Sequence, residues 1–236
     1  MSDDGPSDLR AAVADRWLSQ NRPTHGALAE KRRLAAAMRD VIEHLVTSDA
    51  PEEELRIAAD RLESYAAHLR THPRAPGMWG TPESSTAGSP GGFFDFSPLI
   101  GLANPLAPPI RMTEVGKDRV RAEARFSSAY EGPPGHVHGG YVAAAFDEVL
   151  GFAQTLTGQP GMTGTLTIRY RRPTPLHTDL VFEAWVKGIE GRKIFAEGRC
   201  LAGDRLCAEA EAIFVSVQLD RMREMAEARD ARNRSE

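Results

Sequence analysis

Residues 130–151 read YEGPPGHVHGGYVAAAFDEVLG, and this stretch decides the fold. It opens with turn-forming glycines and prolines and continues into a run of small and apolar residues that predicts a helix over about 140–156. A helix of that composition is expected to be buried. Two glycines follow His138, so backbone N–H groups lie uncovered where the helix begins, in the positive field of its dipole. Such a site suits an anion or a developing oxyanion; alternatively, the glycines only permit a sharp entry into the helix.

Asp147 lies within this otherwise apolar helix. Carboxylates are rarely buried unless they are paired or functional, because the loss of water costs several kcal/mol. Glu148 is adjacent, but consecutive helix positions lie about 100° apart, so the two acids do not share a face. Asp147 is therefore the candidate catalytic carboxylate. The alternative is that one or both acids face solvent.

Segments with the two-residue alternation of strands flank the helix. The first begins at residue 111, and three more lie near 163–172, 179–189 and 192–217. The last is long enough to fold into two strands at Ala202-Gly203-Asp204. A strand, a helix and then an uninterrupted antiparallel meander is the order expected when a curved sheet wraps one central helix. The sequence therefore predicts an α+β fold with about five strands.

One predicted strand, 163–172, is polar along a whole face. Strict alternation places Leu166, Ile168 and Tyr170 on one face, and on the other it places Thr163, Thr165, Thr167, Arg169 and Arg171. In most antiparallel sheets such a face simply meets solvent. Alternatively, the threonines line a polar groove whose arginines bind phosphates, for which the guanidinium group is suited. Arg192 and Lys193 open the next strand but one and could join them.

The rest of the chain divides into three further regions. Residues 1–70 carry apolar residues at helical spacing and predict a two-helix hairpin, whose second helix starts near Pro51 and whose role is packing or oligomerisation. Residues 71–98 are rich in proline and glycine and predict a linker or long loop, with Trp79, Phe93, Phe94 and Phe96 lying on the domain surface or over a pocket. The main domain is expected over 99–220, followed by a charged tail over 221–236.

Composition excludes several classes of function. The formal charge of −4 gives no reason to expect a nucleic-acid binder. The only two cysteines, Cys200 and Cys207, and the scattered histidines have no metal-site spacing, so we expect core thiols and no metal. No apolar run approaches the roughly 20 residues of a membrane-spanning helix, and the N-terminus has no apolar signal region. The sequence therefore predicts a soluble, cytoplasmic protein.

The chain resembles a known family, the hotdog thioesterases of the phenylacetate-pathway type. Within it, the chain is most similar to the thioesterase-superfamily members grouped with the carboxyl-terminal modulator protein. The resemblance covers nearly all of the predicted domain, but neither the helical hairpin nor the linker. Its matching residues, with preserved spacing, are Tyr130-Glu131-Gly132-Pro133-Pro134-Gly135, His138-Gly139-Gly140, Asp147, Met162-Thr163, Leu166, Ile168, Tyr170, Arg172-Pro173, Pro175-Leu176 and Glu190-Gly191-Arg192-Lys193.

The resemblance implies a hotdog-fold acyl-CoA thioesterase of fatty acid metabolism, which hydrolyses an acyl-CoA to the free acid and coenzyme A. It implies that Asp147 is the catalytic carboxylate and that His138 and Gly139 supply backbone N–H groups that polarise the thioester carbonyl. Thr163 would help to position water or substrate. The residues implied to bind the substrate and its coenzyme A moiety are Gly140, Arg169, Arg171, Arg192 and Lys193. No cofactor is implied, since coenzyme A is part of the substrate.

The spacing of the two key groups predicts a homodimer. A helix rises about 1.5 Å per residue, so the nine positions from His138 to Asp147 span roughly 12 to 14 Å. One thioester carbon cannot lie beside both, because the donors and the carboxylate must each reach it directly or through one water. Antiparallel packing of two central helices would bring Asp147 of one chain near Gly139 of the other. The active site is then expected at the subunit interface.

Several alternatives stay open at this level. Asp147 acts either as general base on water or as a nucleophile that forms an anhydride. The sequence does not determine the length of the acyl chain or whether dimers pair into tetramers. A non-catalytic acyl-CoA sensor or scaffold is a competing function, against which Asp147 and Thr163 argue. A hydratase or dehydratase of the same fold is a second, and its usual Asp and His arrangement is not visible.

Overall fold

The computed structural model describes residues 11, 14–15, 17–73, 94–116, 119–159 and 161–216. Most of the predicted linker, including Trp79 and Phe93, and the predicted tail 221–236 lie outside the described residues. The elements in chain order are η1 (Ser19–Asn21), α2 (Gly26–Thr47), α3 (Glu52–Arg70), η3 (Phe94–Phe96), β1 (Arg111–Val115), β2 (Val120–Ala124), η4 (Ser128–Tyr130), α4 (Gly139–Thr155), β3 (Gly161–Tyr170), β4 (Leu180–Glu190), β5 (Lys193–Ala202) and β6 (Arg205–Ser216).

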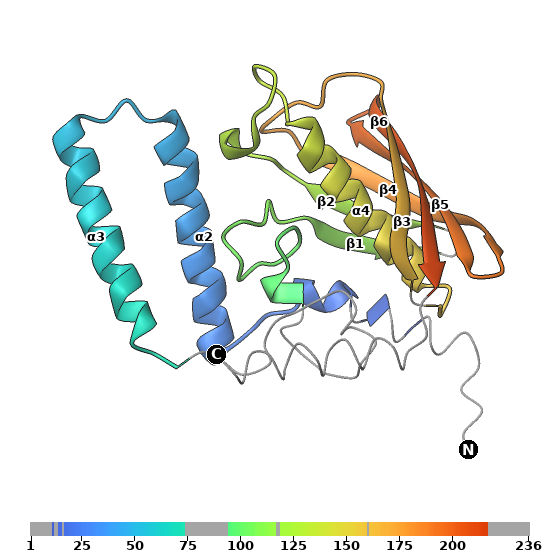
Figure 1. Cartoon of the computed structure of the whole chain (residues 1–236), viewed down its shortest axis with the longest axis horizontal. Helices are drawn as coiled ribbons and strands as arrows, with labels where there is room; N and C mark the ends of the chain where they lie inside the picture. The colour runs from blue at the N-terminus through green and yellow to red at the C-terminus, as the bar shows by residue number, and fades with distance from the viewer. Residues whose placement is uncertain are drawn as a thin grey trace.

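One antiparallel sheet lies against the central helix α4 (Figure 1). Its strand order is β1-β2-β4-β5-β6-β3, with β1 and β3 at the two edges. This confirms the predicted α+β hotdog architecture. The sheet has six strands rather than about five, because the chain reverses between Gly116 and Arg119 and splits the first predicted strand in two. The Gly116 N–H donates to the Arg119 carbonyl at 2.7 Å within that reversal.

The core lies between α4 and the concave side of the sheet. Phe146, Val149 and Leu150 of α4 are fully buried, and the Phe146 ring meets Phe182 of β4 edge to face at 5.3 Å between centroids. Gly198 of β5 permits this close approach. A Cβ atom there would lie 2.8 Å from the backbone oxygen of Glu183 and 3.5 Å from the Phe146 ring. The packing of α4 therefore requires glycine at that position.

Both cysteines are buried and free, as the sequence predicted, and burial raises the pKa of the Cys200 thiol. In the part of the chain that the structure describes, no helix is both long and apolar enough to cross a membrane.

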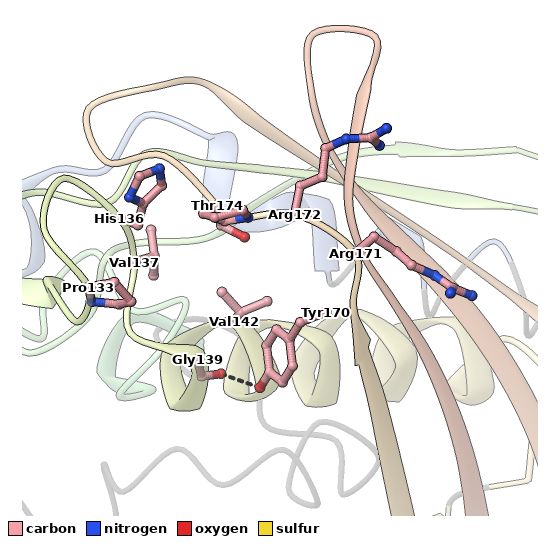
Figure 2. A pocket seen from close by; sticks show the side chains of 10 residues that line it. Pro133, His136, Val137, Gly139, Val142, Tyr170, Arg171, Arg172 and Thr174 are labelled. Carbon is pink, nitrogen blue, oxygen red and sulfur yellow. Dashed lines mark hydrogen bonds between the residues drawn. The ribbon is translucent and has the colours of Figure 1, made fainter.

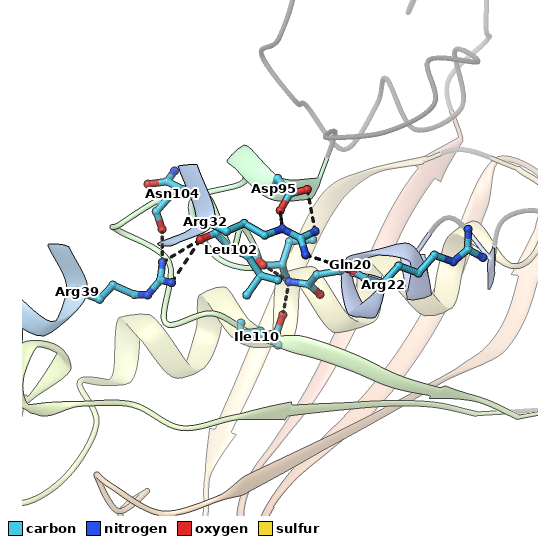
Figure 3. A network of polar contacts seen from close by, with 9 residues as sticks. Gln20, Arg22, Arg32, Arg39, Asp95, Leu102, Asn104 and Ile110 are labelled. Carbon is cyan, nitrogen blue, oxygen red and sulfur yellow. Dashed lines mark hydrogen bonds and ion pairs between the residues drawn. The ribbon is translucent and has the colours of Figure 1, made fainter. Parts of the chain in front are cut away.

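The segment before α2 packs into the core of the hotdog domain. The Trp17 ring lies between Phe94 and Phe152 of α4, at centroid distances of 4.5 and 4.6 Å. Next to it, the side-chain amide of Gln20 donates to the backbone oxygens of Ile100 and Ile110 (Figure 3). These contacts tie residues 17–20 to the chain that leads into β1.

Two arginines fasten α2 to the same region (Figure 3). Arg32 forms a two-pronged ion pair with Asp95, at 2.6 and 3.0 Å, and the Asp95 side chain is only 7% exposed. Arg39 donates to the backbone oxygens of Leu102 and Asn104. A bidentate, largely desolvated arginine–carboxylate pair is geometrically specific, so it fixes the position of α2 on the domain.

The predicted helical hairpin is present, but its two helices differ in environment. α2 buries Ala35 against the domain, whereas no residue of α3 is buried. In Figure 1, α3 stands on the far side of α2 from the sheet. α3 follows Pro51 directly and carries Glu52, Glu53 and Glu54 in its first turn, which agrees with the predicted start.

Glu43 makes a further contact between α2 and the domain. Its carboxylate accepts the Ala129 N–H at 3.4 Å and lies 3.8 Å from the His177 imidazole. Burial raises the pKa of Glu43, but hydrogen bonds from Ser128, Ser127 and the backbone outweigh it and leave the pKa below its ordinary value. A lowered carboxyl pKa means that the ionised form stabilises the folded state.

Glu43→Gln is expected to lower the free energy of unfolding by about 1 kcal/mol at neutral pH. Because the folded-state pKa is lowered, this contribution is present above the ordinary carboxyl pKa of about 4.3 and is lost as the pH falls through the folded-state value. Urea denaturation of both proteins across this pH range measures it. Asp40→Asn, on an exposed part of α2, is the matched control. A pH-independent difference for Glu43→Gln would contradict the assignment.

Candidate active site

The loop before α4 is shaped to deliver His138 to the start of the helix. The His138 N–H donates to the Tyr130 carbonyl and the Val137 N–H to the Thr174 carbonyl, both at 2.8 Å. Gly132 packs directly beneath, because a Cβ atom there would lie 2.7 Å from the Cα of His138. The turn-forming residues of 130–138 therefore hold a fixed backbone path rather than a loose entry.

His138 is the N-cap of α4 through its own side chain. The Nδ1 atom accepts the Gly140 N–H at 3.0 Å, so the ring proton of the neutral imidazole is on Nε2. The His138 carbonyl accepts the N–H groups of Tyr141 and Val142. Among the described residues, nothing accepts the N–H of Gly139. The free donor at this helix start is therefore Gly139, while the Gly140 N–H is held by the cap. The His138 N–H, implied as a second donor, instead donates to the Tyr130 carbonyl.

Tyr170 supports Gly139 from the end of β3 and was not singled out as a site residue by the sequence. Its hydroxyl donates to the Gly139 carbonyl at 2.8 Å (Figure 2). A Cβ atom on Gly139 would lie 3.2 Å from that hydroxyl oxygen, so the two residues are in tight contact. The sequence placed Tyr170 on the apolar face of its strand, and only the pairing of β3 beside α4 shows what its hydroxyl meets.

Asp147 is half-buried on α4 and is held by Thr163 of β3. The Thr163 hydroxyl donates to Asp147 Oδ1 at 2.7 Å. This contact places Thr163 beside the carboxylate, whereas the strand face that strict alternation predicted for Thr163 is wrong. A β-bulge at Gly164 shifts the register, so that Thr163 pairs with Phe214 and Thr165 with Ile213. The extra residue turns Thr163 toward α4, away from the polar face that strict alternation assigned to it.

The two halves of the site lie far apart within one chain. Gly139 and Asp147 belong to the same uninterrupted helix, eight residues apart, which corresponds to about 12 Å. The Gly139 N–H and the Asp147 carboxylate of one chain therefore cannot both contact the same carbonyl group.

The four predicted phosphate-binding cations do not gather at one place: Arg171 lines a cleft beside Gly139, whereas Arg169, Arg192 and Lys193 do not line it. Arg169 pairs with Glu211 at 3.2 Å and Arg171 with Glu209 at 2.6 Å, both across the β3–β6 ladder. Arg192 donates to the Ser216 carbonyl at 3.0 Å, and Lys193 is exposed. Their role in binding coenzyme A stays a prediction.

A cleft of about 370 Å³ adjoins Gly139. Figure 2 shows the side chains of Val137, Val142 and Tyr170 pointing into it and the guanidinium groups of Arg171 and Arg172 pointing away. Its lining residues are Pro133, His136, Val137, Gly139, Val142, Tyr170, Arg171, Arg172, Pro173 and Thr174. The cleft is mainly apolar and leads to the free N–H at the helix start.

His138→Ala is expected to lower the free energy of unfolding by about 1 kcal/mol, because the Gly140 N–H loses its acceptor. His138→Asn should recover most of this loss, since asparagine is a good N-cap. His25→Ala is the matched control: His25 is the N-cap of α2 but makes no side-chain capping bond. Urea denaturation measures all three. Equal losses in His138→Ala and His25→Ala would rule out the capping role.

Comparisons with known proteins point to one family. A family model described as "Thioesterase superfamily" matches residues 134–209. The acyl-coenzyme A thioesterase THEM4 of Xenopus laevis is 36% identical over 89 residues, which are 37% of this chain and 40% of that protein. The human acyl-coenzyme A thioesterase THEM5 is 32% identical over 97 residues, 39% of this chain and 38% of that protein. The chain thus matches about two fifths of the length of these curated relatives.

A solved structure extends the similarity beyond the central region. A crystal structure of a thioesterase superfamily protein superposes with a TM-score of 0.68 at 34% sequence identity, covering 82% of this chain and 97% of that one. The similarity thus includes almost the whole of the solved protein and much more of this chain than the family model matches. On this agreement of sequence and fold, the chain belongs to the thioesterase superfamily.

Proposed function

We propose that this protein is an acyl-CoA thioesterase that hydrolyses its substrate with the Gly139 N–H and the Asp147 carboxylate. The observation that carries the proposal is the unpaired Gly139 N–H at the N-terminus of a buried helix that also bears a half-buried carboxylate. The names of the curated relatives support the choice of an acyl-CoA as the substrate class. A role in fatty acid metabolism and a cytoplasmic location belong to the same proposal.

The Gly139 N–H is the proposed oxyanion donor. It points out of the first turn of α4, where the helix dipole adds positive potential, so it can donate to a thioester oxygen as negative charge develops there. The Tyr170 hydroxyl holds the Gly139 carbonyl on the same peptide segment and limits its movement. A donor that is already positioned does not need to reorganise during the reaction.

Asp147 is the proposed catalytic carboxylate, and Thr163 is its positioning residue. The Thr163 hydroxyl occupies Oδ1, which leaves Oδ2 to act on water or on the thioester carbon. As general base, Asp147 takes a proton from the attacking water, and the coenzyme A thiolate leaves. As nucleophile, it attacks the thioester carbon and expels the coenzyme A thiolate, and water then hydrolyses the acyl anhydride to the free acid and the Asp147 carboxylate. Both routes use the same residues.

The distance between the Gly139 N–H and the Asp147 carboxylate requires a second copy of the chain in the proposed site. A substrate carbonyl bound to Gly139 lies about 12 Å along the helix from Asp147 of the same chain, too far for either route. β3 is a ten-residue edge strand whose outer edge pairs with no strand of the described chain. Such an edge is a template for pairing with another chain. Antiparallel pairing of two β3 strands would lay two α4 helices antiparallel and bring Asp147 near the partner's Gly139.

The cleft beside Gly139 supplies a path for the chain that carries the thioester. Its apolar walls, Val137, Val142 and Pro173, suit an extended chain, and cations at its margin suit phosphates. Arg172 is better placed for phosphate than Arg169 or Arg171, because it donates to the Leu206 carbonyl but pairs with no carboxylate of the described residues. We therefore add Arg172 to the proposed coenzyme A contacts Arg169, Arg171, Arg192 and Lys193.

Asp147→Asn is expected to lower kcat by about 10²–10⁴-fold with little change in stability, because the amide cannot act as base or nucleophile. Thr163→Val, which frees Oδ1 but keeps the carboxylate, should cost less. Glu148→Gln is the matched control on the neighbouring face of α4. The assay follows free thiol released from a panel of acyl-CoAs by the purified protein.

Two results would contradict the proposed function. Near-normal turnover by Asp147→Asn would remove the carboxylate from the chemistry. Tight acyl-CoA binding by the unmodified protein without thiol release across the panel would instead identify a non-catalytic acyl-CoA sensor or scaffold.

A further inference from the structure

α3 carries a continuous apolar stripe that nothing in the described chain covers. Leu55, Leu62 and Leu69 recur every seven residues, with Ala58 and Tyr65 between them, which is the a and d pattern of a coiled coil. The three leucines are 42–48% exposed and Tyr65 is 39% exposed. α3 makes no extensive contact with any other described element. This pattern is typical of a helix that packs against another helix, and no described element packs against the stripe.

α2 contributes a second row beside it. Met38, Val41 and Leu45 are 39–58% exposed, and they lie on the other side of α2 from Arg32, Arg39 and Glu43, which hold the domain. Figure 1 shows α2 and α3 side by side and antiparallel, so the rows lie on neighbouring helices. Seven large apolar side chains, three on α2 and four on α3, are thus 39–58% exposed, and apolar surface that gathers in this way marks an interaction site.

The stability of α3 also favours a partner for the helix. Isolated helices of fewer than about 15 residues are marginal in water, and somewhat longer ones gain most of their stability from packing an amphipathic face. α3 has 19 residues, none of them buried. Burial of its apolar stripe against a second apolar helix face would therefore stabilise it.

We propose that the apolar hairpin face docks against the same face of a second copy of this chain, with the two α3 helices antiparallel. This face consists of the exposed apolar row of α2 and the stripe of α3, which are Met38, Val41, Leu45, Leu55, Ala58, Leu62, Tyr65 and Leu69. Charge distribution favours this occupant and this direction. α3 has Glu52, Glu53 and Glu54 in its first turn and His68 and Arg70 in its last. Antiparallel pairing sets the acidic end of each α3 beside the basic end of the other and also opposes the helix dipoles. The same surface patch serves both copies, as in a two-fold interface.

This interface is separate from the proposed active-site dimer. The hairpin lies on the opposite side of the molecule from β3 and β6 in Figure 1, and none of its apolar residues lines the cleft beside Gly139. The docking therefore does not rest on the proposed thioesterase function. Together with pairing of β3 edges, it would join two dimers.

Single cysteines in the full-length chain test both the docking and its direction. Leu62 lies near the middle of α3, so in antiparallel pairing Leu62→Cys meets its own copy and should form an interchain disulfide under mild oxidation. Leu55→Cys and Leu69→Cys should not link alone but should link when the two proteins are mixed and allowed to exchange subunits. Asp60→Cys, about 200° around the helix from Leu62, is the control that should stay unlinked.

Several outcomes would overturn the proposal. Self-linking by Leu55→Cys and Leu69→Cys separately would mean parallel pairing. No link from Leu62→Cys would mean that a second copy does not cover the stripe. A link within one chain between Leu62→Cys and Met222→Cys would mean that residues 217–236 cover it.

The mass of the assembly gives an independent measurement. Leu62→Glu places a charge in the stripe and should halve the mass found by light scattering, whereas Ser64→Glu on the opposite side should not. Acyl-CoA hydrolysis should be unchanged in both variants, because neither residue lies near Gly139 or Asp147. An unchanged mass for Leu62→Glu would refute the docking, and loss of hydrolysis in Asp147→Asn alone leaves it untouched.

Discussion

The constraint on which the proposed mechanism depends is the distance that one buried helix imposes between the Gly139 N–H and the Asp147 carboxylate. α4 begins with a free N–H at Gly139 and carries Asp147 eight residues later, so the groups are about 12 Å apart and cannot approach each other within a chain. Phe146, Val149 and Leu150 are buried between α4 and the sheet, which holds the helix in place. The proposed hydrolysis therefore depends on the proposed dimer.

Side chains around α4 bind the Gly140 N–H and leave the Gly139 N–H as the proposed donor. His138 satisfies Gly140 through its ring, Tyr170 holds the Gly139 carbonyl, and Thr163 holds Asp147. Each half of the site thus has one polar contact from β3, a strand at the edge of the sheet. At the other end of α4, Trp17 packs on Phe152, so the segment before α2 stabilises the helix that carries the site. The apolar hairpin face of α2 and α3 does not contribute to the stability of α4.

The sequence predicted what depends on local composition and periodicity. The buried helix and the reversal at residues 202–204 followed from small apolar residues and from alternation. The catalytic role of Asp147 stays a prediction. Features that depend on pairing and packing were missed. The bulge at Gly164 decides the face of Thr163, the ring position of His138 decides which glycine N–H is free, and Trp17 reaches the core only through contacts distant in sequence.

The central claim, an active site shared between two chains, is tested most directly by mixing two inactive variants. Gly139→Pro removes the N–H at a helix position where proline is well tolerated, and Gly139→Ala controls for the added side chain. When Gly139→Pro and Asp147→Asn chains exchange subunits, each mixed dimer regains one intact site, so random mixing should restore about a quarter of wild-type hydrolysis. No recovery, with mixed dimers demonstrated, would contradict a shared site.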